Sequence, residues 1–323
     1  MKRAYVLITL AGALLASACS GAASSGSMPA PGSTPDPVTT YALGEGNGPT
    51  GVAVASDGNV WYSAFDGDAL GEISGGVITT FALPSQGAMP SAVVFGSDGA
   101  LWFTEYRGGS IGRRTPDGTI REYPLPQPSS QPLAIAAGND GALWFSEQNA
   151  EAIGRIATDG SVLSYALAAN SNPNAIAAGP DGALWFCEVG SGKIGRITTS
   201  GSITEYTIPT NNSQPSGIAS GPDNAMWFTE RATNMLGRID MKGTISQFTL
   251  PNGMTAPESV AAADGELWFL YSGGIAEATT SGAVVAHPIA GVDTNSINAI
   301  AAAPDGSLWF TERSLNAIVH YVP

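Results

Sequence analysis

Glutamate recurs at one place in this chain, and its neighbours decide what chemistry it could perform. Five copies of Phe-(Thr/Ser/Cys)-Glu follow a tryptophan and end in Glu105, Glu147, Glu188, Glu230 and Glu312. A ring of such carboxylates could hold a cation. Eight residues after each glutamate stands a basic residue: Arg113, Arg155, Arg196, Arg238 or His320. Copies that lack the glutamate also lack this partner, so we predict ion pairs in preference to a metal ring.

The tryptophans show how these residues are spaced. The steps between them are 41, 42, 41, 42, 41 and 41 residues, and an aspartate stands four residues before each one. Seven copies at one period indicate a repeat architecture, which must be interpreted before any single motif. The seven positions are Trp61, Trp102, Trp144, Trp185, Trp227, Trp268 and Trp309.

One copy of the repeat, residues 173–209, predicts four short strands. Segments 174–178, 184–188, 194–198 and 203–208 are apolar or alternating, and Asp-Gly and Ser-Gly turn signals separate them. No window has a helical period. Four antiparallel strands every 41 or 42 residues are typical of a propeller blade, so the sequence predicts an all-β, seven-bladed β-propeller.

The tryptophans are expected in the core of this propeller. A blade is buried on both faces by its neighbours, which explains why Leu-Trp-Phe is apolar at consecutive positions. Replacing one tryptophan by alanine should cost about 3–5 kcal/mol through cavity formation. We therefore assign the tryptophans to blade packing and not to ligand stacking.

Both ends of the repeat region are incomplete. Residues 38–43 resemble a fourth strand without the preceding three, and residues 318–322 resemble a third strand at which the chain stops. We predict that the N-terminal strand completes the last blade and closes the ring, which removes an exposed sheet edge. The predicted propeller spans residues 38–323.

Residues 1–19 have the pattern of an export signal. Lys2 and Arg3 precede an apolar run that is too short to span a bilayer. Ala16-Ser17-Ala18-Cys19 resembles a bacterial lipoprotein cleavage box, which implies lipidation of Cys19; cleavage near Cys19 without lipidation is the alternative. Residues 20–37 are rich in Gly, Ser and Pro and predict a flexible tether. We expect an exported, lipid-anchored protein of the bacterial cell envelope, on the periplasmic side of the outer membrane in a Gram-negative cell.

Charge and cysteine content limit the partners. The chain has 13 basic and 27 acidic residues, and removal of the leader with Lys2 and Arg3 leaves 11 basic residues. Such an acidic surface repels nucleic acid and anionic membranes, so any membrane contact is expected through the lipid alone. Cys187 replaces a strand threonine and is predicted to be buried and unpaired. We expect a monomer that binds a small molecule or a peptide.

One face of the predicted propeller carries its long and variable loops. Binding usually resides in such loops on a rigid scaffold, so we expect a ligand at the central mouth of this face. The residue after the proline that opens each copy should point to that mouth. These positions are Thr50, Ser91, Leu133, Asn174, Ser216 and Glu258, with Asn298 in the last copy. A polar mouth that only holds water is the alternative.

The repeat motif resembles a known family. Gly-Pro-Asp-Gly-x-Leu-Trp-Phe-Thr-Glu, Ile-Gly-Arg-Ile and Glu-Tyr-x-x-Pro, best matched in residues 179–209 and 221–251, are similar to the streptogramin lyase (virginiamycin B lyase-like) family. The resemblance covers residues 38–323. It implies a seven-bladed propeller and a magnesium-dependent lyase that opens macrocyclic depsipeptides by eliminating across the ester C–O bond.

The residues that carry this chemistry in the family are mostly replaced here. The resemblance places the catalytic histidine at Asn298, one metal-binding glutamate at Ser296 and a second histidine near Glu258; a further metal glutamate is retained as Glu312. Asparagine cannot act as a general base. His287 and His320 are expected on outer strands, away from the axis. Two hypotheses remain: a ligand-binding or scaffold propeller, and a lyase that uses Glu258 or Glu312 instead.

Overall fold

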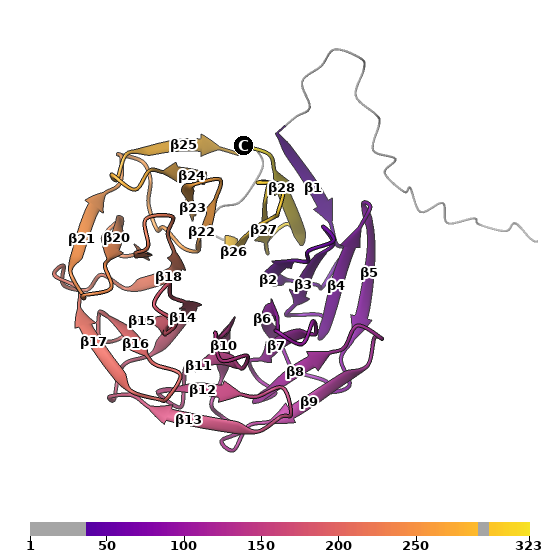
Figure 1. Ribbon diagram of the computed structural model, residues 1–323. Helices are drawn as coiled ribbons and strands as arrows, with labels where there is room; N and C mark the ends of the chain where they lie inside the picture. Colours follow the sequence, from indigo (N-terminus) through magenta and orange to yellow (C-terminus); the bar gives the residue numbers. More distant parts are fainter. Residues whose placement is uncertain (1–36, 290–296) are drawn as a thin grey trace, which may run out of the picture. The chain divides into compact units, whose positions relative to one another are not determined.

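A computed structural model describes residues 37–289 and 297–323, and residues 37–323 form one unit. Within the described ranges, 28 strands form seven four-stranded antiparallel sheets arranged as blades around a central opening (Figure 1). The prediction of an all-β, seven-bladed propeller is confirmed. Each of the first six blades uses four consecutive strands, so each blade is a simple meander.

The strand bounds follow the sequence repeat. Blade one contains β2 (Pro49–Val54), β3 (Val60–Ala64), β4 (Ala69–Ser74) and β5 (Val77–Ala82); blade two β6 (Pro90–Phe95), β7 (Leu101–Glu105), β8 (Ser110–Arg114) and β9 (Ile120–Pro124); blade three β10 (Pro132–Ala137), β11 (Leu143–Glu147), β12 (Ala152–Ile156) and β13 (Val162–Ala166). Blade four contains β14 (Pro173–Ala178), β15 (Leu184–Glu188), β16 (Lys193–Ile197) and β17 (Ile203–Thr207); blade five β18 (Pro215–Ser220), β19 (Met226–Glu230), β20 (Met235–Ile239) and β21 (Ile245–Thr249). Blade six contains β22 (Val260–Ala263), β23 (Glu266–Tyr271), β24 (Gly274–Ala278) and β25 (Val284–Pro288); blade seven β26 (Ile297–Ala302), β27 (Leu308–Glu312), β28 (Ala317–Tyr321) and β1 (Val38–Ala42).

Blade seven is completed by the N-terminal strand. β1 pairs antiparallel with β28, with Val38 opposite Tyr321 and Ala42 opposite Ala317. Backbone hydrogen bonds beyond the strands extend this pairing, from Leu43 N to Asn316 O and from Val322 N to Pro37 O, each 2.8 Å long. The predicted closure is confirmed, and the outer edge of β28 is covered.

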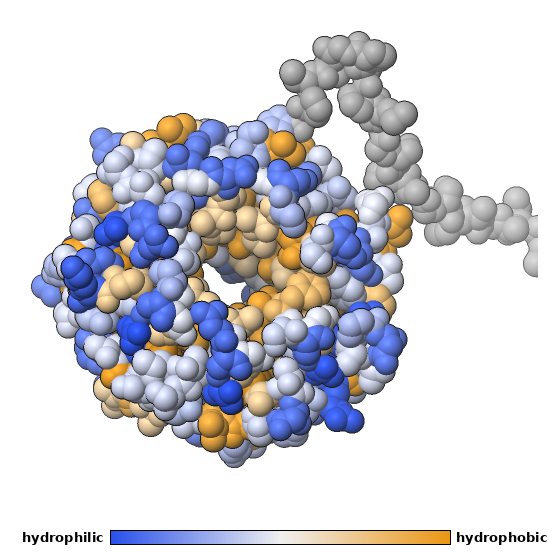
Figure 2. Space-filling model, viewed as in Figure 1, coloured by the Kyte–Doolittle hydropathy of each residue, from blue (hydrophilic) through white to orange (hydrophobic). Residues whose placement is uncertain are grey.

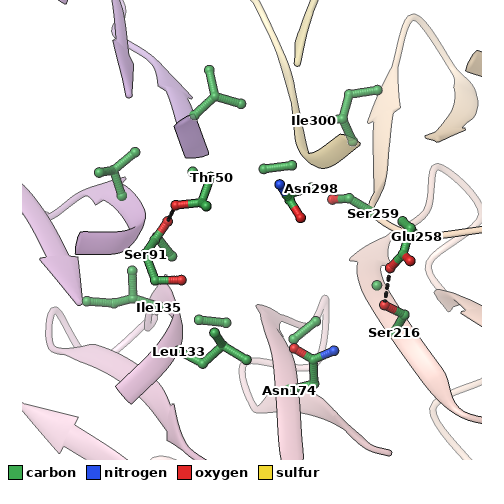
Figure 3. A pocket seen from close by; sticks show the side chains of 18 of the residues that line it. Thr50, Ser91, Leu133, Ile135, Asn174, Ser216, Glu258, Ser259, Asn298 and Ile300 are labelled. Carbon is green, nitrogen blue, oxygen red and sulfur yellow. Dashed lines mark hydrogen bonds between the residues drawn. The ribbon is translucent and has the colours of Figure 1, made fainter. Parts of the chain in front are cut away.

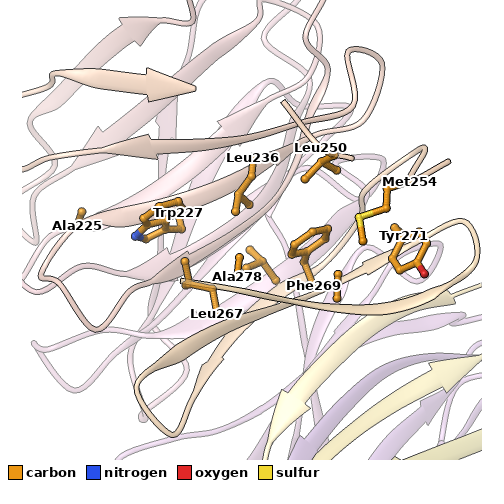
Figure 4. Packing of buried hydrophobic residues seen from close by; sticks show 11 residues of the cluster. Ala225, Trp227, Leu236, Leu250, Met254, Leu267, Phe269, Tyr271 and Ala278 are labelled. Carbon is orange, nitrogen blue, oxygen red and sulfur yellow. The ribbon is translucent and has the colours of Figure 1, made fainter. Parts of the chain in front are cut away.

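The core lies between neighbouring blades. Every tryptophan is at most 8% exposed, which confirms the packing role predicted for these residues. In Figure 4, Trp227 and Leu236 of blade five pack against Leu267 and Phe269 of blade six. Tryptophan and the phenylalanine after it point to opposite faces of a strand, so each fills a different gap between blades.

An aspartate, the tryptophan and an arginine form one unit in blades two to five. In blade two, Asp98 accepts a hydrogen bond of 3.1 Å from Trp102 Nε1 and one of 2.8 Å from Arg113 Nε. The Arg113 guanidinium lies 5.4 Å from the centre of the tryptophan ring. The same aspartate–arginine pair recurs as Asp140–Arg155, Asp181–Arg196 and Asp223–Arg238.

The predicted glutamate–arginine pairs are therefore wrong. In β7 and β8, Trp102 faces Arg113, whereas Glu105 faces Ser110. Three residues of strand, about 10 Å, separate the glutamate from the level of the arginine. The predicted approach of Glu312 to His320 is also wrong, because Glu312 faces Ala317 and His320 faces Trp309.

A glycine in the third strand makes room for the aromatic ring opposite it, which is Tyr62 in blade one and a phenylalanine in blades two to five. A Cβ atom added at Gly195 would lie 2.1 Å from the Phe186 ring, so the ring occupies the space of the missing side chain. Blades six and seven carry Ala276 and Val319 opposite their phenylalanines. The Ile-Gly-Arg-Ile motif therefore combines a packing position, Gly, with an ion-pairing position, Arg.

Several sequence predictions lie outside the described residues. They are the leader in residues 1–19 with Cys19, the tether up to residue 36, and Ser296. No helix long and apolar enough to cross a membrane occurs in the described part of the chain.

Candidate functional site

The first strands of the seven blades surround a cavity of about 590 Å³ at one mouth of the ring. The seven residues predicted at this mouth, one per blade, all line the cavity: Thr50, Ser91, Leu133, Asn174, Ser216, Glu258 and Asn298 (Figure 3). Six of them lie at the start of the innermost strand and Glu258 lies two residues before it, and sheet order places this first strand next to the axis. Glu312 is fully buried in its blade and is not among the residues that line the cavity.

A belt of branched aliphatic side chains lies two residues further along each first strand. All of these side chains also line the cavity, and they are 6–8% exposed. The cavity therefore has a largely polar ring and an apolar belt. The belt residues are Val52, Val93, Ile135, Ile176, Ile218, Val260 and Ile300.

Buried hydroxyl groups fix the first strands relative to one another. Thr104 accepts a hydrogen bond from Ala92 N in its own blade and donates one to Leu133 O in the next, at 3.0 and 2.9 Å. Thr229 bridges Gly217 N and Glu258 O in the same way. Because each bridge joins two blades next to a cavity residue, it holds the polar ring in position.

Cys187 occupies the bridging position in blade four. Its thiol lies 3.6 Å from Gly217 O, on the adjacent blade, and the residue is fully buried. Cys187 is free, as the sequence predicted. Burial raises the pKa of the thiol, which leaves it a packing and hydrogen-bonding group without nucleophilic character.

Glu258 is the one carboxylate of the polar ring, and it is bound on two sides. It accepts a 2.8 Å hydrogen bond from Ser216 Oγ and forms a 2.8 Å ion pair with Arg231 Nε. Burial raises the pKa of Glu258, while the contacts with Ser216 and Arg231 act in the opposite direction. The carboxyl group is therefore held in one orientation and its charge is matched by a cation.

Four residues of the mouth were not predicted as site residues from the sequence: Phe65, Tyr106, Arg231 and Arg313. Three of them line the cavity, and Arg231 holds Glu258. All four occupy the position four residues after the tryptophan of their copy. The sequence did contain a signal for these residues. Their position varies from copy to copy, whereas the position before it is mostly glutamate, and such variation in a repeat indicates a binding position.

The two histidines lie where the sequence placed them, outside the cavity lining. His287 is on the outermost strand β25 and contacts Trp268, with ring centroids 5.3 Å apart. His320 on β28 stacks on Trp309 at 4.2 Å, and burial lowers its pKa. Neither histidine can therefore act on a ligand at the mouth.

The side chains at the mouth do not fit a resident magnesium ion. Among the described residues, no group of three or more His, Cys, Asp or Glu side chains is arranged to hold a metal. Glu258 is already paired, and Glu312 accepts hydrogen bonds from Ser314 Oγ and Leu315 N inside blade seven. The other repeat glutamates are buried within their blades, so the described residues form no carboxylate ring.

These features define the class of the molecule: a closed seven-bladed β-propeller with a cavity at one mouth. The chain belongs to the virginiamycin B lyase family, whose model matches residues 30–171 and 140–322. No curated protein sequence matches the chain.

Three solved structures are similar over nearly their whole length. Selenomethionine-substituted virginiamycin B lyase from Staphylococcus aureus is 35% identical with a TM-score of 0.84, covering 88% of this chain and 99% of its own. A streptogramin B lyase is 33% identical with a TM-score of 0.83, covering 88% and 96%. A catalytically inactive virginiamycin B lyase from Staphylococcus aureus, solved with quinupristin, is 36% identical with a TM-score of 0.83, covering 88% and 99%.

Proposed function

We propose that this protein is a ligand-binding propeller that takes a small molecule or peptide at its central mouth and does not open it chemically. The observation that carries the proposal is the cavity of about 590 Å³, whose lining includes no histidine among the described residues. Ligand sites commonly have volumes of about 300–1,000 Å³, mostly apolar walls and a few polar groups. The aliphatic belt and the polar ring match this description.

The absence of a suitable base supports binding without catalysis. The family resemblance places the catalytic base at Asn298, and an amide cannot take a proton. Glu258, which lines the same cavity, is engaged by Ser216 and Arg231. Removal of a general base typically costs about 10²–10⁴ in rate, so a propeller of this composition is better suited to holding a ligand.

A lyase with a different base is the second candidate. Family membership favours it, since all three similar structures are lyases. Glu258 is the residue to which it would assign proton abstraction, because burial raises the pKa of this carboxyl toward the range of a general base. The ion pair with Arg231 would have to open first.

Quinupristin, found with a relative, is the probe that separates the two candidates. We expect isothermal titration calorimetry to detect binding to the wild-type protein, and mass spectrometry to find the macrocycle intact after incubation with Mg²⁺. Virginiamycin B lyase serves as the positive control for ring opening. Chelator-sensitive ring opening that is lost in Glu258→Gln would establish the lyase, and absence of binding would contradict both candidates for this ligand.

For the cell we propose an exported protein held at the envelope by lipid on Cys19, acting as a monomer. The excess of 27 acidic over 13 basic residues argues against nucleic acid as a partner. We expect the wild type in the membrane fraction and Cys19→Ala in the soluble or uncleaved fraction, measured by immunoblotting after detergent partition. A wild-type protein found in the medium alone would support the simple secretory signal.

A further inference from the structure

One residue per blade follows directly after the second strand and begins the loop on the mouth face. The repeat keeps this backbone position constant, yet its side chain differs between blades: Phe65, Tyr106, Gln148, Val189, Arg231, Ser272 and Arg313. The preceding position is a buried glutamate in five copies. Packing thus governs the glutamate position, whereas its neighbour, which is partly buried or exposed and differs between blades, is suited to recognition where it lines the cavity.

The two aromatic members of this set lie together. Phe65 of blade one and Tyr106 of blade two have ring centroids 6.1 Å apart, and both line the cavity. The Tyr106 hydroxyl is 3.2 Å from the side-chain oxygens of Gln131 and Gln148. These polar contacts hold the phenol in position at the edge of an otherwise apolar wall.

Arg313 of blade seven lies over the Phe65 ring. Its guanidinium lies 4.8 Å from the centre of the Phe65 ring, and its Nη2 atom contacts both carboxylate oxygens of Asp66 at 2.8 and 3.1 Å. Because Asp66 matches its charge, Arg313 acts here as a planar surface and not as a free cation. Both aromatic rings are therefore fixed before a ligand arrives, which reduces the entropy lost on binding.

The cavity has two chemically different walls. Leu133, the one apolar member of the polar ring, stands beside Ser91 on the side of blades two and three, whereas Asn174, Ser216 and Glu258 form the side of blades four to six (Figure 3). Figure 2 shows hydrophobic residues around the central opening and hydrophilic ones over much of the outer face. A ligand with one aromatic end and one hydrogen-bonding end would match both walls.

We propose that Phe65, Tyr106 and Leu133, with Arg313 above Phe65, form a subsite for an aromatic group of the ligand. The inference rests on the proposed function, because it takes the mouth to be the binding site. Aromatic groups gain from offset or tilted contacts with other rings beyond the apolar area that they bury. The subsite therefore selects neutral ligands that carry an aromatic side chain.

N-acetyl-L-phenylalaninamide is the probe for this subsite, with N-acetyl-L-leucinamide as the aliphatic reference. We expect NMR titration of the wild-type protein to show tighter binding of the aromatic probe. Tyr106→Leu and Phe65→Leu should each weaken that binding about tenfold, since leucine keeps the apolar bulk but removes the ring. Tyr106→Phe should stay within about twofold, and Val189→Leu, at the same repeat position in blade four, should have no effect.

The outcomes separate the subsite from the proposed function. Equal affinity for both probes, or unchanged affinity in both leucine variants, overturns the subsite. If Asn174→Ala weakens quinupristin binding while Tyr106→Leu and Phe65→Leu leave it unchanged, the mouth binds ligand and the subsite is wrong. If neither the aromatic probe nor quinupristin binds, both proposals fail. Melting temperatures of all variants verify that they are folded.

Discussion

Glu105 of blade two is a buried ionisable residue whose carboxyl group lacks hydrogen-bond partners. It is 1% exposed, and no hydrogen bond of normal geometry reaches either carboxyl oxygen. Burial, and second the negative charge of Glu122, raise its pKa to about 8. In blade five the same position, Glu230, receives a hydrogen bond of 2.7 Å from Gln247, where blade two has Glu122. Blade two thus holds two carboxyl groups where blade five holds a carboxyl and an amide.

This difference predicts a pH dependence. The folded state retains the Glu105 proton up to about pH 8, whereas the unfolded chain releases it near the ordinary pKa of 4.5. The free energy of unfolding should therefore fall as pH rises from about 4.5 to about 8, by up to about 1.4 kcal/mol per pH unit for one proton. Glu122→Gln removes one cause of the raised pKa, so in urea unfolding the fall should end at a lower pH and the total loss of stability should be smaller.

Ser85→Ala is the matched control for that substitution. Ser85 donates to Glu122 through its backbone N and its Oγ, at 3.0 and 2.5 Å, so its replacement removes the hydroxyl contact but keeps both carboxyl groups. We expect this variant to lose stability equally at every pH, so that the fall ends at the same pH as in the wild type. A fall that ends at the same pH in wild type and Glu122→Gln would show that Glu122 does not control the proton.

At the scale of the strand, the contact between glycine and phenylalanine is open to test. Gly195→Ala forces the Phe186 ring out of its space and should cost about 1–3 kcal/mol through overpacking. Ala276→Gly in blade six, where the phenylalanine already faces an alanine, should cost no more than about 1 kcal/mol. Chemical denaturation of both variants measures the difference, and equal losses would contradict a special fit in blade four.

The periodicity of the sequence was sufficient to predict the blades, because each copy has one tryptophan and each tryptophan packs between two neighbouring blades. The register inside a blade needed one further step. The loop between β7 and β8 sets Glu105 opposite Ser110, and antiparallel pairing then forces Trp102 opposite Arg113. Joint occurrence of Glu and Arg in the copies suggested a contact that this geometry forbids.

The polar ring of the mouth could be predicted, but the ion pairs at the mouth, Arg231 with Glu258 and Arg313 with Asp66, could not. Thr50, Asn174 and Glu258 follow from strand order, since a first strand must lie next to the axis. The pairing of Arg313 with Asp66 joins residues 247 positions apart, in blades that meet only when the ring closes. No local pattern encodes such a contact, and the same holds for Arg231 with Glu258.

For the molecule as a whole, closure of the ring should govern stability. Deletion of residues 38–44 removes β1 with its pairing to β28 and the stacking of Tyr41 on Trp309. We expect the melting temperature to fall by many degrees in calorimetry, because an edge of blade seven and part of its core become exposed. Deletion of residues 20–36 is the control and should leave it unchanged. An unchanged melting temperature after the first deletion would contradict closure at β1.

The pairing of β1 with β28 also sets an order of events during biosynthesis. Val38 pairs with Tyr321, so β1 has no partner until β28 has been synthesised. Blades one to six are each made of consecutive strands and can form without β28, whereas blade seven cannot be completed before it is present. Pairings between residues this far apart form slowly, because the chain loses the entropy of closing a long loop before the stabilising contacts form. We therefore expect translation arrest or premature termination before β28 to leave an open, protease-sensitive arc of blades, however well each of those blades has folded.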